Sequence, residues 1–588
     1  MSLYKDASLV MIPSAYKDGK LYSIRPTDGS GDFTFSRGSN LAATRVDVNG
    51  LIEKGRENLV TYSNDFSQWT KSAVTATSGQ SGYDGSSDAW LVDISGGVSS
   101  QQIRQSATAS GVTSYSIYAK ANTLDWILLY VDASQITRGY FDIANGVLGG
   151  ANNLIDSKIE SVGNGYYRCT IVFSDSITQV RLYLASGDGN ITQSSGSVYI
   201  QDAQLEQGLV ATDYIETGTS AAQSGILEDM PRLDYSGGAS CPSLLLEPQR
   251  TNGIAYSEYF DSYWDSDVQS NNITITHNAT TSPEGLQNAT KLAGNSTSNN
   301  PSTAYIGKAS AVSSQPYVSS VFAKAGEYDY IILTIGSYTS GFWASFNLDT
   351  GEVDTDPTAS NTTASIEDYG DGWYRCMIHT TNTAGAEGVY FSPSVDGTRT
   401  TNYTNTTNGV YIFGAQVEAG SYPTSYIPTY GTSQTRVKDG SNLQLDGVKT
   451  NGYFGDTYTL FFEFDKLDFG ASAGNFNYLY DDINATCMYV YGSTLAINTT
   501  SGEVYTNFTQ GFTDSSKGKF LVKYDGSEVK IFKDGSLYKT YTNPSSRWDN
   551  PKFYRLSLST ASASISYKQF LTFPTALTDS ECIALTSI

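Results

Sequence analysis

One stretch occurs twice in the chain, and this duplication constrains the fold more than any other feature. The first copy begins at Glu53 and reads Glu-Lys-Gly-Arg-Glu-Asn-Leu-Val-Thr-Tyr-Ser-Asn-Asp-Phe, with Trp69 three residues later. The second copy begins at Glu247 and is followed by Trp264. Glu, Arg, Asn, Tyr, Ser and Phe keep the same spacing at a constant offset of 194 residues. Each copy opens a long stretch of predicted strands, so the chain contains a duplicated module.

Later elements repeat as well. Gly165-Tyr-Tyr-Arg-Cys169 returns as Gly372-Trp-Tyr-Arg-Cys376, and the closing strand 198–206 returns as 410–418. The offset grows to 212 residues, which indicates insertions between strands, where surface loops tolerate them. The two cysteines occupy equivalent positions and are expected to be small core residues. Five cysteines without a close pair predict neither a disulfide framework nor a zinc site.

Composition favours strands over helices. The 588 residues should form roughly three or four domains, and glycine (55), tyrosine (43) and few charged residues (16%) are typical of strands joined by tight turns. We therefore predict an all-β protein of tandem duplicated sandwiches followed by a third sandwich. The predicted boundaries are an N-terminal attachment arm (1–52), module one (53–219), a linker that packs with the arm (220–246), module two (247–432) and a C-terminal domain (433–588).

The N-terminal arm is too short for a core of its own. We expect it to gain burial from a partner or from a later segment of the chain. Gly225-Ile-Leu-Glu in the linker resembles Gly50-Leu-Ile-Glu in the arm. Our hypothesis is that module one is inserted into a unit formed by the arm and the linker.

The charge of the chain argues against several partners. The net charge is −23, and no basic footprint for nucleic acid or for an anionic membrane is visible. No apolar stretch is long enough to span a bilayer, and the N-terminus lacks the pattern of a signal peptide. We expect neither nucleic-acid binding nor membrane insertion.

Both modules resemble the jelly rolls of carbohydrate-binding modules. Module one has Asn58-Leu59, Phe66 and Trp69 at its start and Tyr199-Ile-Gln-Asp202-Ala-Gln-Leu205 at its end. In that family the first and last strands often share a structural calcium ion, which makes Asp202 a candidate ligand. Module two has Gly414 at the equivalent position, which argues against the same site there.

The C-terminal domain resembles the laminin-G or concanavalin-like sandwich. The resemblance rests on the hairpin turns Asp525-Gly526 and Asp534-Gly535 and on the closing segment 576–585. In that segment, Thr578 and Glu581 predict a capping box at the start of a short helix.

The whole arrangement resembles virion proteins of tailed bacteriophages, such as fibres and head or tail decorations. The segments that carry this resemblance are 1–13, 231–235, 244–252, 372–375 and 425–429. It implies a virion structural protein, made in the host cytoplasm, that attaches to the capsid or tail by its N-terminus. Fibres of this kind are usually homotrimers, and their sandwiches adhere to host cell-surface polysaccharide. The alternatives are a capsid decoration that binds no glycan and a polysaccharide-degrading hydrolase.

Glycan binding needs exposed aromatic faces with amides or charged groups nearby. Aromatic residues that recur in both modules, or lie next to recurring positions, are expected mainly in the core or at its rim: Trp69, Trp126, Tyr130, Tyr166, Trp264, Tyr330 and Trp373. Aromatic residues that do not repeat are the better ligand candidates. We predict Tyr259, Tyr263, Trp343 and Trp548 as glycan-binding residues.

Charged residues in the duplicated stretch suggest a structural role. We expect Glu53 with Arg56, and Glu247 with Arg250, to form a repeated ion pair that fixes the entry strand, since arginine suits bidentate pairing. The alternative is a ligand clamp.

Catalytic machinery is weakly represented, and we predict no enzyme. Glu463-Phe-Asp465-Lys-Leu-Asp468 is similar to the Glu-x-Asp-x-x-Glu strand of laminarinase-like hydrolases, whose paired carboxylates act as nucleophile and acid. The last position is Asp468, whose side chain is one methylene shorter than the glutamate of the hydrolase pattern. We therefore prefer to interpret these carboxylates as a polar, solvent-facing side of the strand. Two histidines, His277 and His379, have no nucleophile elbow near them. No cofactor is required; Asp202, Asp481 and Asp482 are weak candidates for structural calcium.

Overall fold

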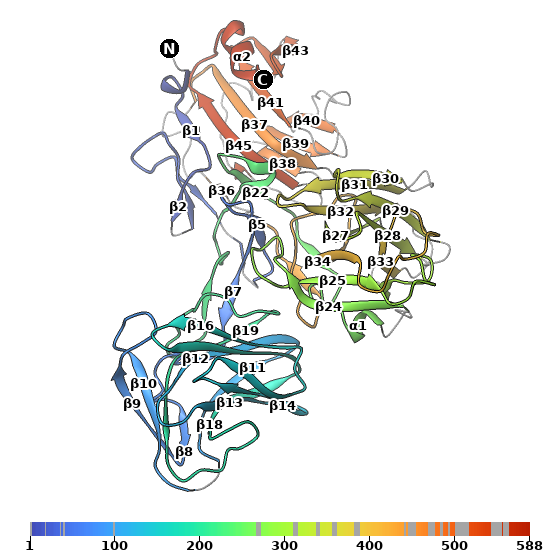
Figure 1. Ribbon diagram of the computed structural model, residues 1–588. Coiled ribbons are helices and arrows are strands. Elements are labelled where there is room, and N and C mark those ends of the chain that lie inside the picture. The colour runs from blue at the N-terminus through green and yellow to red at the C-terminus, as the bar shows by residue number, and fades with distance from the viewer. Residues whose placement is uncertain are drawn as a thin grey trace.

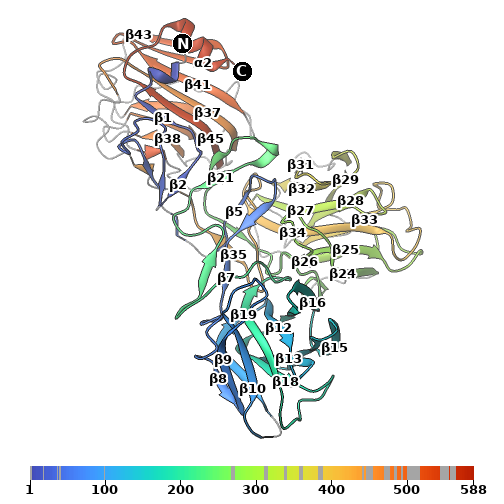
Figure 2. The same cartoon turned by 60° about the vertical axis from the view of Figure 1, so that its left-hand side comes forward.

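The computed structural model is almost entirely β, as predicted, and contains three sandwiches grouped around a central junction (Figures 1 and 2). The described residues are 3–17, 19–35, 37–38, 41–97, 100–265, 272–309, 316–336, 341–355, 362–381, 388–439, 443–444, 454–468, 477–481, 486–491, 494–499, 517–542, 555–556 and 564–587.

Module one consists of two antiparallel sheets packed face to face. The first sheet has the strand order β16 (Asp156–Gly163), β17 (Tyr166–Ser174), β12 (Val112–Ala121), β19 (Ser197–Gln207), β10 (Ala89–Ile94), β9 (Val74–Gln80). The second has the order β15 (Val147–Asn152), β14 (Ile136–Asp142), β13 (Trp126–Asp132), β18 (Ile177–Ala185), β11 (Gln102–Ala109), β8 (Thr70–Ser72).

Module two repeats this topology, except that its second sheet has no counterpart of β8 among the described residues. Its first sheet has the order β24 (Ile273–Thr280), β25 (Ala289–Gly294), β34 (Gly409–Ala419), β27 (Tyr317–Ala325), β32 (Trp373–Thr380), β31 (Thr362–Asp368). Its second sheet has the order β26 (Ile306–Ala309), β33 (Gly388–Ser394), β28 (Tyr330–Gly336), β29 (Phe342–Asn347), β30 (Glu352–Thr355). A short helix, α1 (Ser262–Asp265), lies beside β26.

The duplicated stretch fixes the closing strand of each module. The side-chain amide of Asn58 donates to the carbonyls of Ala203 and Ile215, and its Oδ1 accepts from the backbone of Val60 and Leu205. Asn252 makes the same four bonds in module two. A buried asparagine with all its polar groups satisfied is well suited to lock one register. The motif therefore marks module entry, as its position predicts.

The predicted ion pairs within the motif are wrong. Glu53 binds Arg45, and Glu247 binds Arg232 and Arg436. Each motif arginine instead faces a buried glutamate of its module's closing strand, at 3.9 Å in both copies: Arg56 with Glu206, and Arg250 with Glu418. Contacts between first and last strands are long-range, so sequence proximity misidentified the partners.

Each module enters and leaves through a two-stranded stem. In module one, β7 (Arg56–Asn58) pairs with β20 (Ala222–Ser224). In module two, β23 (Arg250–Asn252) pairs with β35 (Gln434–Arg436). A hairpin of β5 (Thr44–Val46) and β6 (Ile52–Lys54) precedes the first stem. Both modules are thus insertions whose ends lie together.

The third sandwich is built from chain segments on both sides of these insertions. Its first sheet has the order β21 (Arg232–Asp234), β22 (Ser243–Leu246), β45 (Ser564–Phe573), β37 (Tyr458–Asp468), β41 (Gly518–Tyr524), β42 (Glu528–Lys533), β43 (Ser536–Thr542), and β1 (Leu9–Met11) also pairs with β45. Its second has the order β2 (Tyr16–Lys17), β3 (Lys20–Leu21), β4 (Phe33–Thr34), β36 (Leu443–Gln444), β44 (Arg555–Leu556), β38 (Asn477–Asp481), β39 (Thr486–Tyr491), β40 (Thr494–Thr499).

The N-terminal segment is therefore part of the third sandwich and not a separate arm. Leu9, Met11, Leu21 and Phe33 are fully buried in the core that β37, β41 and β45 form. Its burial comes from a later segment of the chain, which was one of the two predicted alternatives. Both termini lie on this sandwich, and module one lies at the opposite end of the molecule (Figure 1).

The linker packs with the N-terminal segment, as the insertion hypothesis predicts. The backbone N–H of Arg37 donates to Asp229, and that of Val46 donates to Asp234. Short 3-10 turns, η1 (Leu3–Lys5) and η2 (Ser236–Gly238), complete these segments. At the other end of the chain, α2 (Asp579–Thr586) starts with the predicted capping box of Thr578 and Glu581.

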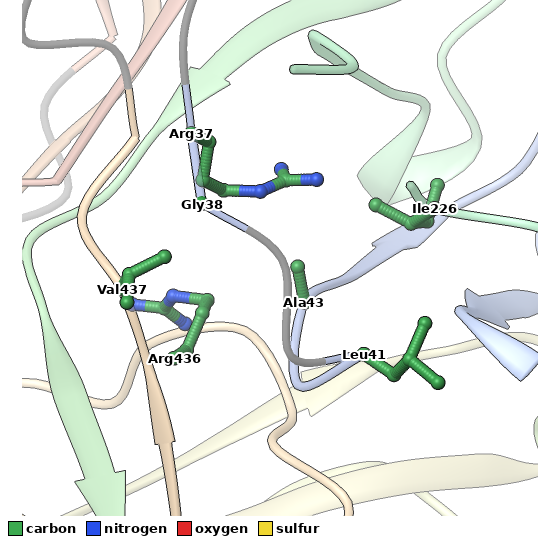
Figure 3. A pocket seen from close by; sticks show the side chains of 7 residues that line it. All are labelled: Arg37, Gly38, Leu41, Ala43, Ile226, Arg436 and Val437. Atoms are coloured by element: carbon green, nitrogen blue, oxygen red, sulfur yellow. The ribbon is translucent and has the colours of Figure 1, made fainter. Parts of the chain in front are cut away.

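A buried ionic cluster joins the four chain segments that lead into and out of the two modules. Asp439 binds Arg37 (3.2 Å) and Arg232, while Glu247 binds Arg232 (2.8 Å) and Arg436 (3.0 Å). The side chains are at most 3% exposed. Figure 3 shows Arg37 and Arg436 on the two sides of a small pocket at this junction, which leaves no room for a water molecule. The pocket is a packing feature and not a ligand site.

Candidate functional site

The outer face of the second sheet of module one carries the clearest recognition surface. Successive residues of a strand point to opposite faces. Leu129 and Val131 of β13 lie in the core, so Tyr130 points outward. The same alternation turns Arg181 of β18 outward, because Val180 and Leu182 are in the core.

The strand register places six outward residues in one row across the sheet. Tyr130 lies opposite Arg138 of β14 on one side and Arg181 on the other. Arg181 lies opposite Arg104 of β11, whose neighbour Ile103 is in the core. Asn152 of β15 and Thr70 of β8 end the row. We call Arg104, Arg138 and Arg181, with Tyr130 among them, the arginine row.

Arg181 is held in place at the centre of this row. Its guanidinium donates to Gln179 (3.0 Å), to the hydroxyl of Tyr183 (3.3 Å) and to Asp132 (2.5 Å). Its Cζ lies 5.4 Å from the ring centre of Tyr130, within cation–π range. Partial burial lowers the pKa of Arg181, but the bonds to Tyr183 and Asp132 outweigh it, so the pKa lies above the ordinary value.

The other two arginines are less constrained. Arg138 lies 5.7 Å from the ring centre of Tyr140 and donates to Asn152. Nε of Arg104 is buried and has no hydrogen-bond partner within the described part of the chain. A buried donor without a partner costs free energy, roughly 1–3 kcal/mol.

A second row, of two tyrosines and one leucine, runs beside the arginine row. Tyr140, Leu128 and Tyr183 lie next to one another on β14, β13 and β18. Tyr130 and Tyr183 meet edge to face, with ring centres 6.1 Å apart. Both side chains are half-buried, so part of each ring faces solvent. Tyrosine rings beside fixed polar groups can bind the apolar faces and the hydroxyls of sugars.

The same face of module two has a different composition. Trp343, Thr334, Tyr390 and Gly307 stand where module one has Arg138, Tyr130, Arg181 and Arg104, according to the strand registers. The ring of Tyr390 covers Gly307, where a Cβ atom would meet it at 2.1 Å. The core positions Ile127 and Leu129, in contrast, are retained as Ile331 and Leu333. The two modules share a core and differ on this face.

The predicted glycan-binding residues are dispersed. Trp343 lies half-buried on the outer face of module two, 5.9 Å from the guanidinium of Arg399. Tyr263 packs against the core of module two, with Nζ of Lys308 4.1 Å from its ring centre. Tyr259 packs where module two meets Val112, Val172 and Leu209 of module one. Trp548 lies outside the described residues.

Tyr259 is therefore an interface residue and not an open ligand platform. Its ring lies 4.9 Å from that of His277, whose pKa is lowered by burial. Among the repeated aromatic residues, Trp69, Trp264, Trp373 and Tyr166 are buried, as expected. Trp126, Tyr130 and Tyr330 lie half-buried on outer faces. Cys169 and Cys376 are both fully buried, as their repeat positions predict.

Sequence reasoning expected Tyr130 and Trp126 mainly in the core or at its rim, and it did not single out Tyr183 or the three arginines. The alternation within each strand gives the outward direction of these residues. Their alignment across the sheet depends on pairings between strands that are far apart in sequence, such as β11 with β18. An antiparallel register is not encoded in any single strand.

A solvent-accessible cleft of about 260 Å³ lies between the two modules. Arg56, Glu57, Gln207, Tyr430 and Gln434 are among its lining residues. Its charged and phenolic groups are engaged inside the protein: Arg56 faces Glu206 and Glu284, and Tyr430 donates to Glu258. The cleft is thus a weaker candidate for a ligand site than the outer face.

Asp202 is the one calcium candidate whose side chain the structure describes, and its contacts do not form a cluster of metal ligands. Asp202 is buried and accepts a hydrogen bond from the hydroxyl of Tyr83 (3.1 Å). Burial raises the pKa of Asp202 to about 7. The described residues contain no group of three or more potential ligands among His, Cys, Asp and Glu. Asp481 lies in β38, of whose side chains nothing is described, and Asp482 lies outside the described residues.

The carboxylates of the hydrolase-like strand are engaged separately. Glu463 accepts a hydrogen bond from Gln569. Asp465 forms ion pairs with Lys517 and Lys568, both at 3.2 Å. The side chain of Asp468 lies outside the described residues. These contacts favour the predicted polar strand face over a nucleophile–acid pair.

The described chain has no helix long and apolar enough to cross a membrane. No protein-family model and no curated protein matches the sequence. Among solved structures, the chain is similar to the N-terminal CBM22-1–CBM22-2 tandem domain of Xyn10C from Paenibacillus barcinonensis. That similarity has a TM-score of 0.20 and 11% sequence identity, and it covers 65% of this chain and 99% of the other. The architecture of the two modules therefore rests on their own sheets and registers.

Proposed function

We propose that this protein binds surface glycans through the outer faces of its two modules and catalyses no reaction. The observation that carries the proposal is the contact of two half-buried tyrosines, Tyr130 and Tyr183, beside fixed polar groups on module one. Aromatic faces bind the C–H surfaces of sugars, and guanidinium and amide groups bind sugar hydroxyls. The equivalent face of module two, where Trp343 is half-buried and Tyr390 is buried, supplies a second surface of different composition.

We further propose that the protein is an appendage of a bacteriophage virion. This part rests on the resemblance of segments such as 1–13 and 244–252 to virion proteins. In this proposal the third sandwich, which includes the N-terminal segment, is the part that attaches, and module one is the distal end. The position of both termini on that sandwich supports this arrangement (Figure 1). Trimerisation would multiply weak contacts by avidity.

Glycan-array binding by the purified full chain tests the proposal. Tyr130→Ala and Tyr183→Ala should each weaken binding at least severalfold, since sugar stacking depends on the ring. Tyr22→Ala is the matched control, because Tyr22 is exposed (37%) and lies on the third sandwich. Circular dichroism confirms that each variant is folded.

Two outcomes would overturn glycan adhesion. If the folded chain binds no glycan, a decoration protein without glycan binding is the better assignment. If the chain releases reducing sugars and Glu463→Gln abolishes the release, the protein is a hydrolase.

A further inference from the structure

The arginine row is a concentrated positive charge in an acidic protein. The chain carries 36 basic and 59 acidic side chains, yet three arginines align on neighbouring strands of one face. Asp132 is the acidic side chain that binds Arg181 there. Strands are about 4.8 Å apart, so the row from Arg138 to Arg104 spans roughly 14 Å.

This alignment is unfavourable in the isolated protein. Arg104 and Arg181 lie directly opposite each other on an antiparallel pair, where Cβ atoms are about 5 Å apart and like charges destabilise the sheet. Asp132 pairs with Arg181, and no described acidic side chain forms an ion pair with Arg104. The repulsion between these arginines costs free energy in the unbound protein. A bound ligand of opposite charge would offset that cost.

We infer that module one selects anionic polysaccharides, whose carboxylate, sulfate or phosphate groups bind along the arginine row while the sugar rings contact Tyr130 and Tyr183. This inference rests on the proposed glycan binding and specifies its ligand class. Guanidinium groups form bidentate, charge-assisted bonds with such anions. The row has several cationic positions at the spacing of the strands, which suits a polymer with repeated acidic groups.

Module two supplies an internal contrast. Its equivalent row consists of Gly307, Tyr390, Thr334 and Trp343 and contains no arginine. The anion preference should therefore belong to module one, and the face of module two should favour neutral or less charged sugars. The two modules would then recognise different parts of one surface.

The test compares polygalacturonate with its fully methyl-esterified form, which keeps the sugar backbone and removes the charge. Heparin and a phosphate-bearing teichoic acid serve as sulfate and phosphate probes, and single-stranded oligo(dT) as a non-carbohydrate polyanion. The full chain is compared with the triple variant Arg104→Gln, Arg138→Gln and Arg181→Gln. The control Lys20→Gln, Lys158→Gln and Lys539→Gln changes exposed lysines away from the face and has the same net charge.

We expect one or more acidic polysaccharides to bind at least tenfold more tightly than the neutral ester. The arginine variant should lose most of this difference, and the lysine control should keep it. Raising the salt from about 50 mM to about 500 mM should weaken binding, because exposed charges are screened. Binding of the neutral ester should persist in the arginine variant.

Other results would overturn the inference. Equal affinity for the ester and the acid, unchanged in the arginine variant, leaves glycan binding intact and refutes anion selection. If the lysine control loses the preference for acidic polysaccharide as fully as the arginine variant does, the preference depends on net charge and not on the arginine row. Oligo(dT) binding as tight as that of the acidic sugars shows a general polyanion site. No binding to any glycan refutes the proposed function itself.

Discussion

Lys54 should be the most sensitive single position for the docking of module two onto the rest of the molecule. It lies on β6, before module one, yet its Nζ is buried between Glu258 and Glu284 of module two. The bond to Glu258 measures 2.7 Å, and all three side chains are at most 2% exposed. Tyr426 also donates to Glu258, at 3.0 Å.

Lys54→Met keeps most of the side-chain volume but leaves two buried carboxylates without their cation. Removing one partner of a buried ion pair typically costs about 3–5 kcal/mol. We expect a loss of that size at pH 8 in the opening free energy of β6 and of the 282–294 segment. Hydrogen exchange of peptides from these segments measures it, since a multidomain chain does not unfold in two states. The control Lys158→Met removes an exposed lysine paired with Glu160 and should cost less than about 1 kcal/mol.

The stability that Lys54→Met loses relative to the wild type should also depend on pH. Burial and the neighbouring Glu284 raise the pKa of Glu258, although Lys54 opposes this. Without Lys54, the folded state binds protons more strongly than the unfolded state does, so the variant regains stability as the pH falls toward the ordinary glutamate range. A deficit below about 1 kcal/mol, or one that does not shrink at pH 5, would refute this account of the interface.

Three further perturbations test other parts of the structure. Asp202 has a left-handed backbone (φ 50°) that asparagine tolerates, and its pKa is raised to about 7. The wild type should therefore lose stability as the pH rises from about 4 to about 7. Asp202→Asn should show no such loss and should be up to ~4 kcal/mol more stable than the wild type at pH 8. If the melting temperatures of the two proteins change with pH in the same way, this account is wrong. Met11→Ala should destabilise the third sandwich by about 2–5 kcal/mol, measured by hydrogen exchange of peptides from β1 and β45, because Met11 is fully buried there. Exposed Ile24→Ala should have little effect, and equal effects would argue for a detached arm. Glu247→Gln removes a charge shared by two buried arginines and should cost about 3–5 kcal/mol, seen as faster proteolysis at the junction; an unchanged cleavage rate would show that the cluster is dispensable.

The sequence predicts the repeated parts of this protein well because they depend on local patterns. Alternating apolar residues and paired turns indicate strands, and two copies of one motif reveal the duplicated module. Asn58 and Asn252 illustrate this, since equal spacing from each module start gives them equal roles. The capping box of Thr578 and Glu581 is also local, and it forms as predicted.

The candidate site was only partly predictable. Aromatic residues that repeat were expected inside, and Trp69, Trp264 and Trp373 are buried accordingly. Tyr259 does not repeat, yet it packs against module one, because an interface between modules leaves no periodic signal in either of them. The arginine row requires three strand pairings that join residues up to 77 positions apart, such as Arg104 with Arg181.

By itself, the sequence determines the all-β class, the duplication, the entry motif and the outward direction of residues on each strand. Only the tertiary structure decides that both modules are insertions into a sandwich that begins with β1 and ends with β45. It also decides the partners of Lys54, Arg56 and Glu247, and it aligns three arginines on one face. The physical reason is that strand alternation and turns are short-range, whereas sheet register and buried ion pairs depend on segments that meet only when the chain has folded.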